Sequence, residues 1–238
     1  MTALRLEQIS KRSQQGYRLL DALVDVSLNI ERGEVVNVSG ARGAGRSTLV
    51  RIAGGALPPD AGRVYVEDVD LYGRQRIDVG RRVAVCGTQF LPAHGSIVYE
   101  QVMIPLIALR ISRIDASLRA HRALDRVGAG HVATRAPTEL VPDEISRVAL
   151  ARAMVRDPTV LLMDEPTVAL GLLEREPILR LVSEIAKESR FAVLVTGDET
   201  ASMAGADRCL RLSGGRLLGD ATPSPADVIP LRQSNPGA

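Results

Sequence analysis

The sequence contains very little lysine and almost no excess of charge. Lysine occurs only at Lys11 and Lys187, so arginine carries nearly all of the positive charge in a chain of 238 residues. The formal net charge is +2 at pH 7. A charge so close to zero gives no indication of a nucleic-acid-binding surface or of a general trap for acidic ligands. We therefore expect no nucleic-acid partner.

Cysteine and long apolar runs are also scarce. The two cysteines, Cys86 and Cys209, each lie in an apolar run of strand type, which favours buried, reduced thiols over a redox or metal site. The chain does not open on a charged and then apolar leader, and no apolar run approaches the ~18–20 residues of a membrane-spanning helix. The sequence therefore predicts a cytoplasmic protein that reaches a membrane only through a partner.

The hydrophobic pattern predicts an α/β fold. Residues alternate between apolar and polar over Ala3–Ile9 and Val24–Ile30, as in half-buried strands. Short apolar runs that alternate with helical segments are typical of a buried parallel sheet. A chain of this length suits one domain with an inserted subdomain. The further predicted strands cover residues 35–39, 64–66, 82–86, 160–163, 192–195 and 208–212.

The character of the sequence changes between residues 97 and 135, where apolar residues recur every three or four positions. This spacing predicts helices. We expect one nucleotide-binding domain over residues 1–220, with a helical insertion at about 92–155. Four prolines in the last segment, 221–238, indicate a loosely held tail.

One glycine-rich segment indicates a phosphate-binding loop. It runs from Gly40 to Thr48 as Gly-Ala-Arg-Gly-Ala-Gly-Arg-Ser-Thr, and an apolar run that predicts a helix follows over Leu49–Leu57. Amides at the start of a helix attract anionic phosphates. The pattern requires lysine before the two hydroxyl residues, and this sequence has Arg46 there.

Three downstream features strengthen this interpretation. An apolar strand over Val160–Met163 delivers Asp164 and Glu165 at its carboxyl end, Gln89 follows an earlier strand, and a helix at 147–153 precedes the acidic pair. The order and spacing resemble the ATP-binding subunits of ABC transporters over residues 3 to about 218. Residues 100–106 resemble the subgroup that drives lipoprotein release, macrolide export and division-site permeases.

The resemblance implies a P-loop NTPase fold with a parallel core sheet, an antiparallel β subdomain and an inserted α-helical subdomain. It implies that ATP and Mg²⁺ bind at the glycine-rich loop, that the metal is held by Ser47, Gln89 and Asp164, and that Glu165 polarises the attacking water. The residues expected around the nucleotide are Gly40, Gly43, Ala44, Gly45, Arg46, Ser47, Thr48, Gln89 and Asp164.

The charged position of the loop is the first departure from the family's pattern. The family's lysine contacts phosphate as a compact point charge, whereas the guanidinium of Arg46 is planar, bulkier and suited to bidentate contacts. Arg46 is also consistent with a general preference for arginine, because the chain is so poor in lysine. We expect nucleotide binding to be weakened and alignment of the γ-phosphate to suffer.

The family's Leu-Ser-Gly-Gly-Gln signature falls on Leu140–Glu144, the second departure. The family uses its serine hydroxyl and glycine amides to bind the γ-phosphate held by the opposite subunit. Val141 has no hydroxyl and Pro142 has no amide hydrogen. Asp143 and Glu144 either face the triphosphate, where two like charges at ~4 Å cost on the order of 4 kcal/mol at a dielectric constant of ~20, or turn away and cap their own helix.

Three further positions depart from the family. Gly171 stands where its D-loop ends in aspartate, and Gly197 stands in place of the switch histidine. Ser13 replaces the aromatic residue that stacks on adenine, with Tyr17 as a possible substitute. Several losses together predict a chain that does not hydrolyse ATP quickly.

These observations predict a degenerate ATP-binding subunit on the inner face of the cell membrane, with a membrane permease and a second ABC nucleotide-binding domain, in the same or a different chain, as partners. An active ATPase that uses Glu165 as its base is the alternative. A soluble ABC protein of DNA repair or translation is disfavoured, because the chain lacks a coiled-coil insertion, a basic patch and a second cassette. Residues 90–106 are expected to receive the permease, and their apolar residues are either anchors for it or subdomain core: Phe90, Leu91, Ile97, Val98 and Tyr99.

Overall fold

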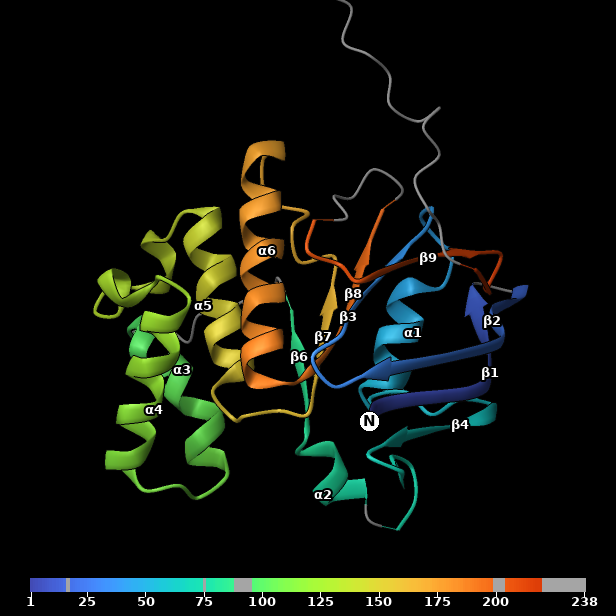
Figure 1. Cartoon of the computed structure of the whole chain (residues 1–238), viewed down its shortest axis with the longest axis horizontal. Helices are drawn as coiled ribbons and strands as arrows, with labels where there is room; N and C mark the ends of the chain where they lie inside the picture. Colours follow the sequence, from blue (N-terminus) through green and yellow to red (C-terminus); the bar gives the residue numbers. More distant parts are fainter. Residues whose placement is uncertain (16–17, 75, 88–95, 199–203, 220–238) are drawn as a thin grey trace, which may run out of the picture.

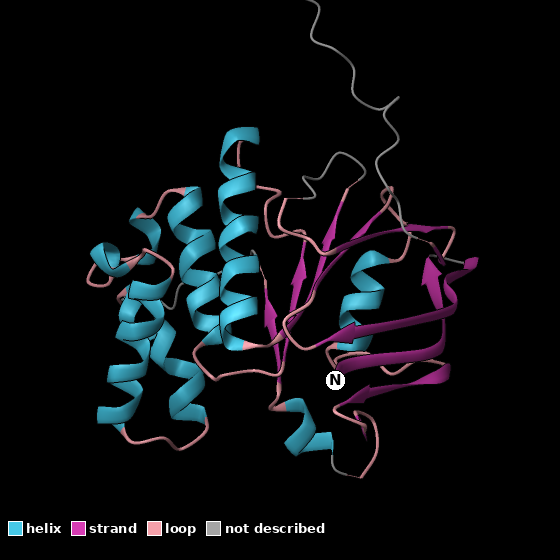
Figure 2. Cartoon of the chain, viewed as in Figure 1, coloured by secondary structure: helices cyan, strands magenta, loops and turns pink. Residues whose placement is uncertain are grey.

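The computed structural model describes residues 1–15, 18–74, 76–87, 96–198 and 204–219, and its elements are arranged around two sheets (Figures 1 and 2). The smaller sheet is antiparallel and has the strand order β2-β1-β4-β5. Its strands are β1 (Thr2–Gln15), β2 (Arg18–Glu31), β4 (Ala61–Val66) and β5 (Val69–Asp70). The two alternating segments are strands, as predicted, and both are longer than the sequence indicated.

The larger sheet is the parallel core that the sequence predicts. Its order is β10-β9-β3-β8-β7-β6, and every neighbouring pair is parallel except β9 and β10. The strands are β3 (Val35–Ser39), β6 (Val83–Cys86), β7 (Val160–Asp164), β8 (Ala192–Gly197), β9 (Arg208–Ser213) and β10 (Arg216–Leu218). Parallel strands end at one edge of the sheet, so β3, β7 and β8 place their carboxyl ends side by side.

Helices cover both faces of this core sheet (Figure 1). Helix α1 (Arg46–Ala53) lies between it and the antiparallel sheet, and α5 (Pro142–Met154) and α6 (Leu172–Ser189) lie on the other side. Helix α1 stops at Ala53 rather than at the predicted Leu57, because Gly54 and Gly55 follow and glycine is a poor helix former. The short helix α2 (Arg76–Gly80) precedes β6.

The segment predicted to be helical forms a subdomain at the edge of the molecule (Figure 1). It consists of α3 (Val98–Ala108), α4 (Arg113–Arg126) and two 3₁₀ turns (Gly130–Val132 and Pro137–Glu139), and α5 packs against it. Val98 is fully buried in its core, and the ring of Tyr99 stacks on His121 with centroids 4.4 Å apart. These two residues therefore pack the subdomain instead of offering free anchors.

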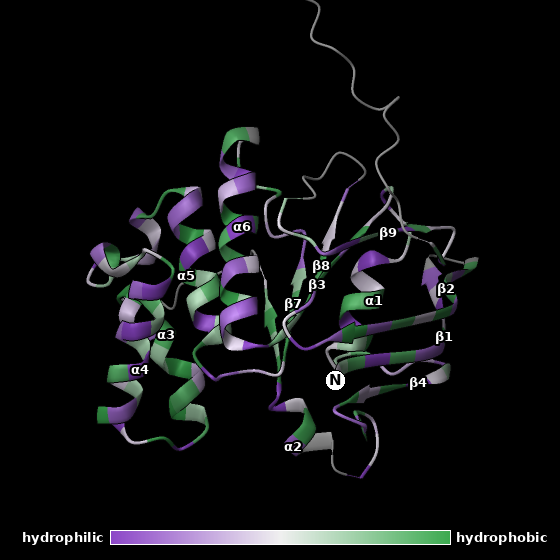
Figure 3. Ribbon diagram, in the orientation of Figure 1, coloured by the Kyte–Doolittle hydropathy of each residue, from purple (hydrophilic) through white to green (hydrophobic). Residues whose placement is uncertain are grey.

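Apolar residues recur along the helices and strands (Figure 3), and the buried ones form two clusters that hold the fold together. One joins α3, α4, α5 and α6 to one face of the core sheet, and the other joins α1 and the antiparallel sheet to the opposite face. Successive residues of β7 alternate between them, since Leu161 and Met163 belong to the first cluster and Val160 and Leu162 to the second. The core sheet is thus buried on both faces and fixes the strand ends.

The cysteine prediction holds for one residue of the two. Neither cysteine forms a disulfide in the described part of the chain; Cys86 is buried, and burial raises its pKa to about 12. Cys209 is only partly buried, which corrects the prediction. Among the described residues no helix has the length and apolar character needed to cross a membrane. The proline-containing tail, Phe90 and Leu91 lie outside the described residues.

Candidate functional site

A cavity of about 690 Å³ opens at the carboxyl edge of the core sheet, next to the antiparallel sheet. The glycine-rich loop forms one wall and the acidic end of β7 another. The structure therefore brings together two segments more than 110 residues apart, as the sequence predicted. The lining residues are Ser13, Leu20, Asp21, Ala22, Arg42, Gly43, Gly45, Arg46, Ser47, Thr48, Glu165 and Asp198.

The backbone of the loop depends on two glycines with positive φ. Gly45 has φ +105° and packs so tightly against β2 that an added Cβ would lie 2.1 Å from the carbonyl oxygen of Ala22. Gly43 has φ +85°, but a Cβ there would meet nothing within 4 Å. Gly45 therefore fits the loop under the antiparallel sheet, while Gly43 faces open space.

The amino terminus of α1 is free to bind an anion. No side chain caps it in the described part of the chain, and the amide of Leu49 donates to the carbonyl of Gly45. The amides of Arg46, Ser47 and Thr48 precede that first helical bond, and such amides have no partner within a helix. Uncapped amides beside a cavity fit a phosphate group.

Arg46 forms an ion pair with Glu165 across this cavity. Its Nη2 donates to Oε1 of Glu165 at 2.5 Å, and its side chain is only 7% exposed, against 37% for Glu165. The other terminal nitrogen, Nη1, is buried without a hydrogen-bond partner among the described residues. An unpaired buried donor is costly, so this guanidinium is held at the edge of the cavity with its hydrogen bonds incomplete.

Asp164 is held by a residue that sequence reasoning missed. The hydroxyl of Thr196, at the end of β8, donates to Oδ1 of Asp164 at 2.7 Å. The amide of Glu165 donates to both the hydroxyl and the carbonyl of Thr196, each at 3.2 Å. Glu165 itself has φ +49°, the left-handed region that is strained for a glutamate. A lone threonine at the end of an apolar strand was the available signal for this role.

The predicted metal ligands are placed only in part. Ser47 is exposed on the cavity wall, and Asp164 lies at the end of β7 with one oxygen engaged by Thr196. Gln89 lies outside the described residues, and no group of three or more acidic, histidine or cysteine side chains forms a metal site within the described part. Ser47 and Asp164 are the oxygen donors that would hold Mg²⁺ beside bound phosphates.

Two predicted binding residues support the loop without lining the cavity. Gly40 is buried at the end of β3, and an added Cβ would lie 2.4 Å from the carbonyl oxygen of Leu212. Ala44 is buried, and its amide donates to the carbonyl of Ala41. Their role is therefore to set the path of the loop.

The ionic side chains of the cavity carry a net charge of −1. The arginines at 42 and 46 face three carboxylates, those of Asp21, Glu165 and Asp198. A polyphosphate therefore depends on backbone amides and Mg²⁺ for its stabilisation. Sequence reasoning did not find Asp21 and Asp198, since neither belongs to a recognisable motif.

The expected adenine platform has no aromatic ring in the described residues. Ser13 lines the cavity, as its place in the sequence predicts, and Tyr17 lies outside the described part. The partly exposed Leu20 also lines the cavity and offers an aliphatic surface to a base.

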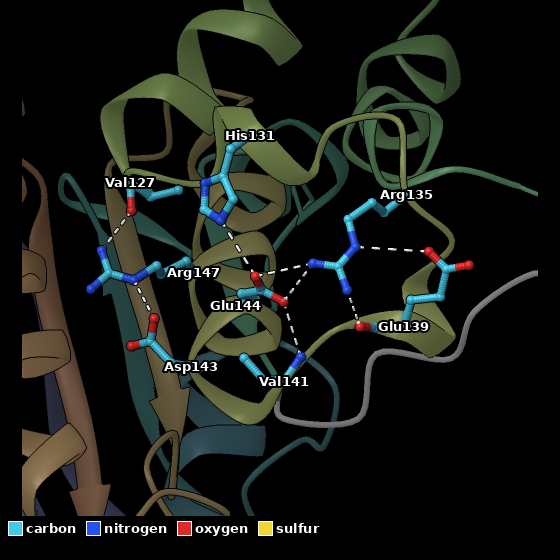
Figure 4. A network of polar contacts seen from close by, with 8 residues as sticks. All are labelled: Val127, His131, Arg135, Glu139, Val141, Asp143, Glu144 and Arg147. Carbon is cyan, nitrogen blue, oxygen red and sulfur yellow. Dashed lines mark hydrogen bonds and ion pairs between the residues drawn. The ribbon is translucent and has the colours of Figure 1, made fainter.

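At the start of α5, the acidic residues turn toward their own helix (Figure 4). The carboxylate of Glu144 accepts the amide of Val141 at 3.0 Å and pairs with Arg135 at 3.2 Å and His131 at 3.3 Å. Asp143 pairs with Arg147 at 2.7 Å. Of the two arrangements left open by the sequence, the structure shows the self-capped one. Glu144 thus holds its carboxylate against the amide of Val141 that precedes the helix, while no side chain caps the first-turn amides in the described part of the chain.

The pKa of Glu144 lies below its ordinary value of 4.5. The hydrogen bond from the Val141 amide is the largest cause, and His131 and Arg135 lower it further.

Two neighbouring segments also lack the family's polar groups. Gly197 ends β8 beside Ser39 of β3, so the switch position carries no side chain. Gly171 begins α6, where its amide donates to Glu174 at 3.1 Å. Val168, on the same loop, is exposed.

The comparisons decide which family this site belongs to. The family described as ABC transporter matches residues 23–168. The lipoprotein-releasing system ATP-binding protein LolD of Myxococcus xanthus is 37% identical over 91% of this chain and 99% of its own length.

The chain belongs to the ABC transporter family.

Its other relatives agree with this assignment. The methionine import ATP-binding protein MetN 1 of Yersinia pestis bv. Antiqua is 34% identical over 90% of this chain, which spans 64% of that relative's length. The ATP-binding cassette MJ0796, solved as a dimer with ADP and Pi, is 27% identical with a TM-score of 0.78 and covers 91% of this chain and 97% of its own. This ABC chain is thus the ATP-binding subunit of a transporter, and its cavity lies at the P-loop.

The two loop glycines give the first testable prediction. Gly45→Ala places a side chain against the Ala22 carbonyl at positive φ, and we expect it to lower the free energy of unfolding by about 3 kcal/mol and to abolish MgADP binding. Gly43→Ala, at positive φ but in open space, serves as the matched control and is expected to cost about 1 kcal/mol. Urea unfolding measures both, and equal losses would contradict the close approach at Gly45.

The lowered pKa of Glu144 gives the second prediction. A carboxylate with a depressed folded pKa stabilises the protein above its unfolded pKa and loses that effect as pH falls through the folded value. We expect Glu144→Gln to cost about 1 kcal/mol at pH 7, typical of a helix cap, and the difference from wild type to begin to shrink as pH falls below 4.5 and to vanish only below the lowered pKa of the folded protein. Glu184→Gln, at an exposed position of α6, is the control. A cost of Glu144→Gln that stays constant with pH would refute the capping role.

Proposed function

We propose that this chain is a degenerate nucleotide-binding subunit of an ABC transporter, which binds ATP and Mg²⁺ weakly and hydrolyses ATP slowly or not at all. It lies against the inner face of the cell membrane, docked on a permease, and pairs with a second cassette. In this role it couples or regulates the transporter.

The self-capped start of α5 is the observation that carries the proposal. A terminal phosphate on the opposite cassette would meet the exposed apolar side chain of Val141 and the ring of Pro142, which has no amide hydrogen. The carboxylate of Glu144 lies beside the start of the helix, where it accepts the Val141 amide and adds negative charge. Because Arg135 and His131 hold this carboxylate, moving it away from an incoming phosphate would require several contacts to break at once.

Both nucleotide sites of an assembly are affected. In a head-to-tail pair, one site takes its P-loop from this chain and the other takes its signature segment from it. The first site has Arg46 in ion pair with Glu165 and no side chain at Gly197. The second meets the start of α5. A complete partner therefore rescues neither site fully, and two copies of this chain are more impaired still.

The helical subdomain supports docking on a permease. Ile104 and Ile107 of α3 are exposed and, with Met103, Ile111, Arg110 and Arg113, line a shallow hollow at the outer end of the subdomain. Exposed apolar side chains in a group mark an interaction surface. The hollow is lined partly by the segment 90–106 that the sequence indicated and partly by the residues that follow it, up to Arg113.

Steady-state phosphate release from the purified transporter tests the proposal. We expect wild-type assemblies to turn over below about 0.1 s⁻¹, under the ordinary range of about 1–1000 s⁻¹. We expect the combined variant Val141→Ser, Pro142→Gly, Asp143→Gly and Glu144→Gln, which restores the signature, to raise the rate at least about tenfold. The reason is that it restores the hydroxyl and the amides that contact the terminal phosphate. Fast release that Glu165→Gln abolishes would instead establish the alternative, an active ATPase with Glu165 as its base.

Calorimetry with ATP and Mg²⁺ on the isolated chain tests the weak-binding part. We expect a dissociation constant in or above the high micromolar range, and tighter binding by the Arg46→Lys variant, because a compact ammonium contacts phosphate oxygens from more directions than a planar fork. Thr2→Ala, far along β1, is a neutral comparison. Tight binding by the unmodified chain would contradict this view of Arg46.

A further inference from the structure

The ion pair between Arg46 and Glu165 engages a terminal nitrogen of Arg46 at the edge of the nucleotide cavity. Nη2 donates to the Glu165 carboxylate at 2.5 Å, and Nη1 is buried without a partner among the described residues. A phosphate that enters the cavity therefore meets a guanidinium already paired with a carboxylate. The residue that replaces the family's phosphate-binding lysine is engaged from within the chain.

A carboxylate and a phosphate are alternative partners for the same guanidinium. A carboxylate is planar and a phosphate is tetrahedral, but each presents a pair of anionic oxygens that suits the fork of an arginine. Glu165 is held over the cavity from a left-handed backbone position with φ +49°, and its side chain is partly exposed. A phosphate offers several oxygens to the guanidinium, whereas Glu165 contacts it through Oε1 alone.

We propose that Glu165 is an internal competitor of the nucleotide for Arg46, so that diphosphate binding exchanges one ion pair for another and releases the Glu165 carboxylate. The inference deepens, and rests on, the nucleotide site proposed above. The free chain holds its candidate base neutralised and anchored. Occupation of the cavity frees it, which makes Glu165 a sensor of phosphate as well as a candidate base.

Another carboxylate of the cavity has a different partner. Asp21 pairs with Arg12 at 3.4 Å, on the strands of the antiparallel sheet. Asp21 lines the same cavity as Glu165 and carries the same charge, but it has no bond to Arg46. Asp21→Asn therefore removes one negative charge from the cavity and leaves the ion pair intact.

A double-mutant cycle on the full chain tests the exchange. The probe is MgADP, measured by titration calorimetry, because ADP lacks the terminal phosphate that draws two cassettes together. We expect Glu165→Gln to tighten ADP binding about tenfold when residue 46 is arginine. The same change in the Arg46→Gln background is expected to have less than about a twofold effect, since the competition no longer exists.

The matched control separates competition from simple charge removal. Asp21→Asn is expected to change ADP affinity by the same factor in both backgrounds, because its effect acts through space. Glu165→Ala provides a second variant with the same expected coupling to Arg46, and inorganic pyrophosphate is expected to reproduce the result without a base or ribose. Circular dichroism melts confirm that each variant is folded.

Three outcomes would overturn the inference. Tightening by Glu165→Gln that is equal in both backgrounds would show only charge removal. No tightening in the Arg46 background would show that the pair does not oppose binding, and so would undetectable ADP binding by both wild type and Glu165→Gln. Turnover plays no part in this cycle, so fast ATP hydrolysis would refute the proposed degenerate function and leave the exchange standing.

Discussion

The start of a helix is the physical feature on which this molecule's chemistry depends. Each α-helix leaves amides without partners at its amino terminus, and what meets them determines what the helix binds. Helix α1 begins at Gly45 with no side-chain cap among the described residues, beneath a sheet that allows only glycine there. At helix α5 the carboxylate of Glu144 accepts the amide of Val141, just before the helix. The first terminus is open to an anion, and the second has a fixed negative charge beside it.

The parallel sheet gives these termini their positions. Strands β3, β7 and β8 end at one edge of the sheet. The glycine loop, the acidic pair and Thr196 therefore lie close together, although they are far apart in the sequence. Two buried apolar clusters pack against the two faces of the sheet. The scaffold is thus that of an ABC cassette. Arg46, at the position of the family's phosphate-binding lysine, and Glu165, expected to polarise the attacking water, contact each other.

The sequence predicted the scaffold well because its signals are local. Alternation marked β1 and β2, continuous apolar runs marked the core strands, and glycine spacing marked the loop. Contacts between segments that are distant in the sequence could not be predicted in this way. Nothing in the order of residues shows that Arg46 meets Glu165, that Thr196 holds Asp164, or that Arg135 and His131 secure Glu144. The sequence left two arrangements open for the acids at 143 and 144, and only the contacts around α5 distinguish them. The helix end at Ala53 was misplaced because the apolar run continues past the glycine pair.

The exchange of lysine for arginine also changes which chemical reagents can report on the cavity. Both lysines of the chain lie elsewhere, Lys11 against Asp60 at 2.6 Å and Lys187 against Asp207 at 3.2 Å. Acylating and Schiff-base-forming nucleotide analogues, which attack an ε-amine, therefore find no target among the side chains that line it. Dicarbonyl reagents selective for guanidinium groups find Arg42 exposed and Arg46 shielded. The two arginines of one short loop should thus differ in labelling rate, and that difference reports whether the inner one is engaged.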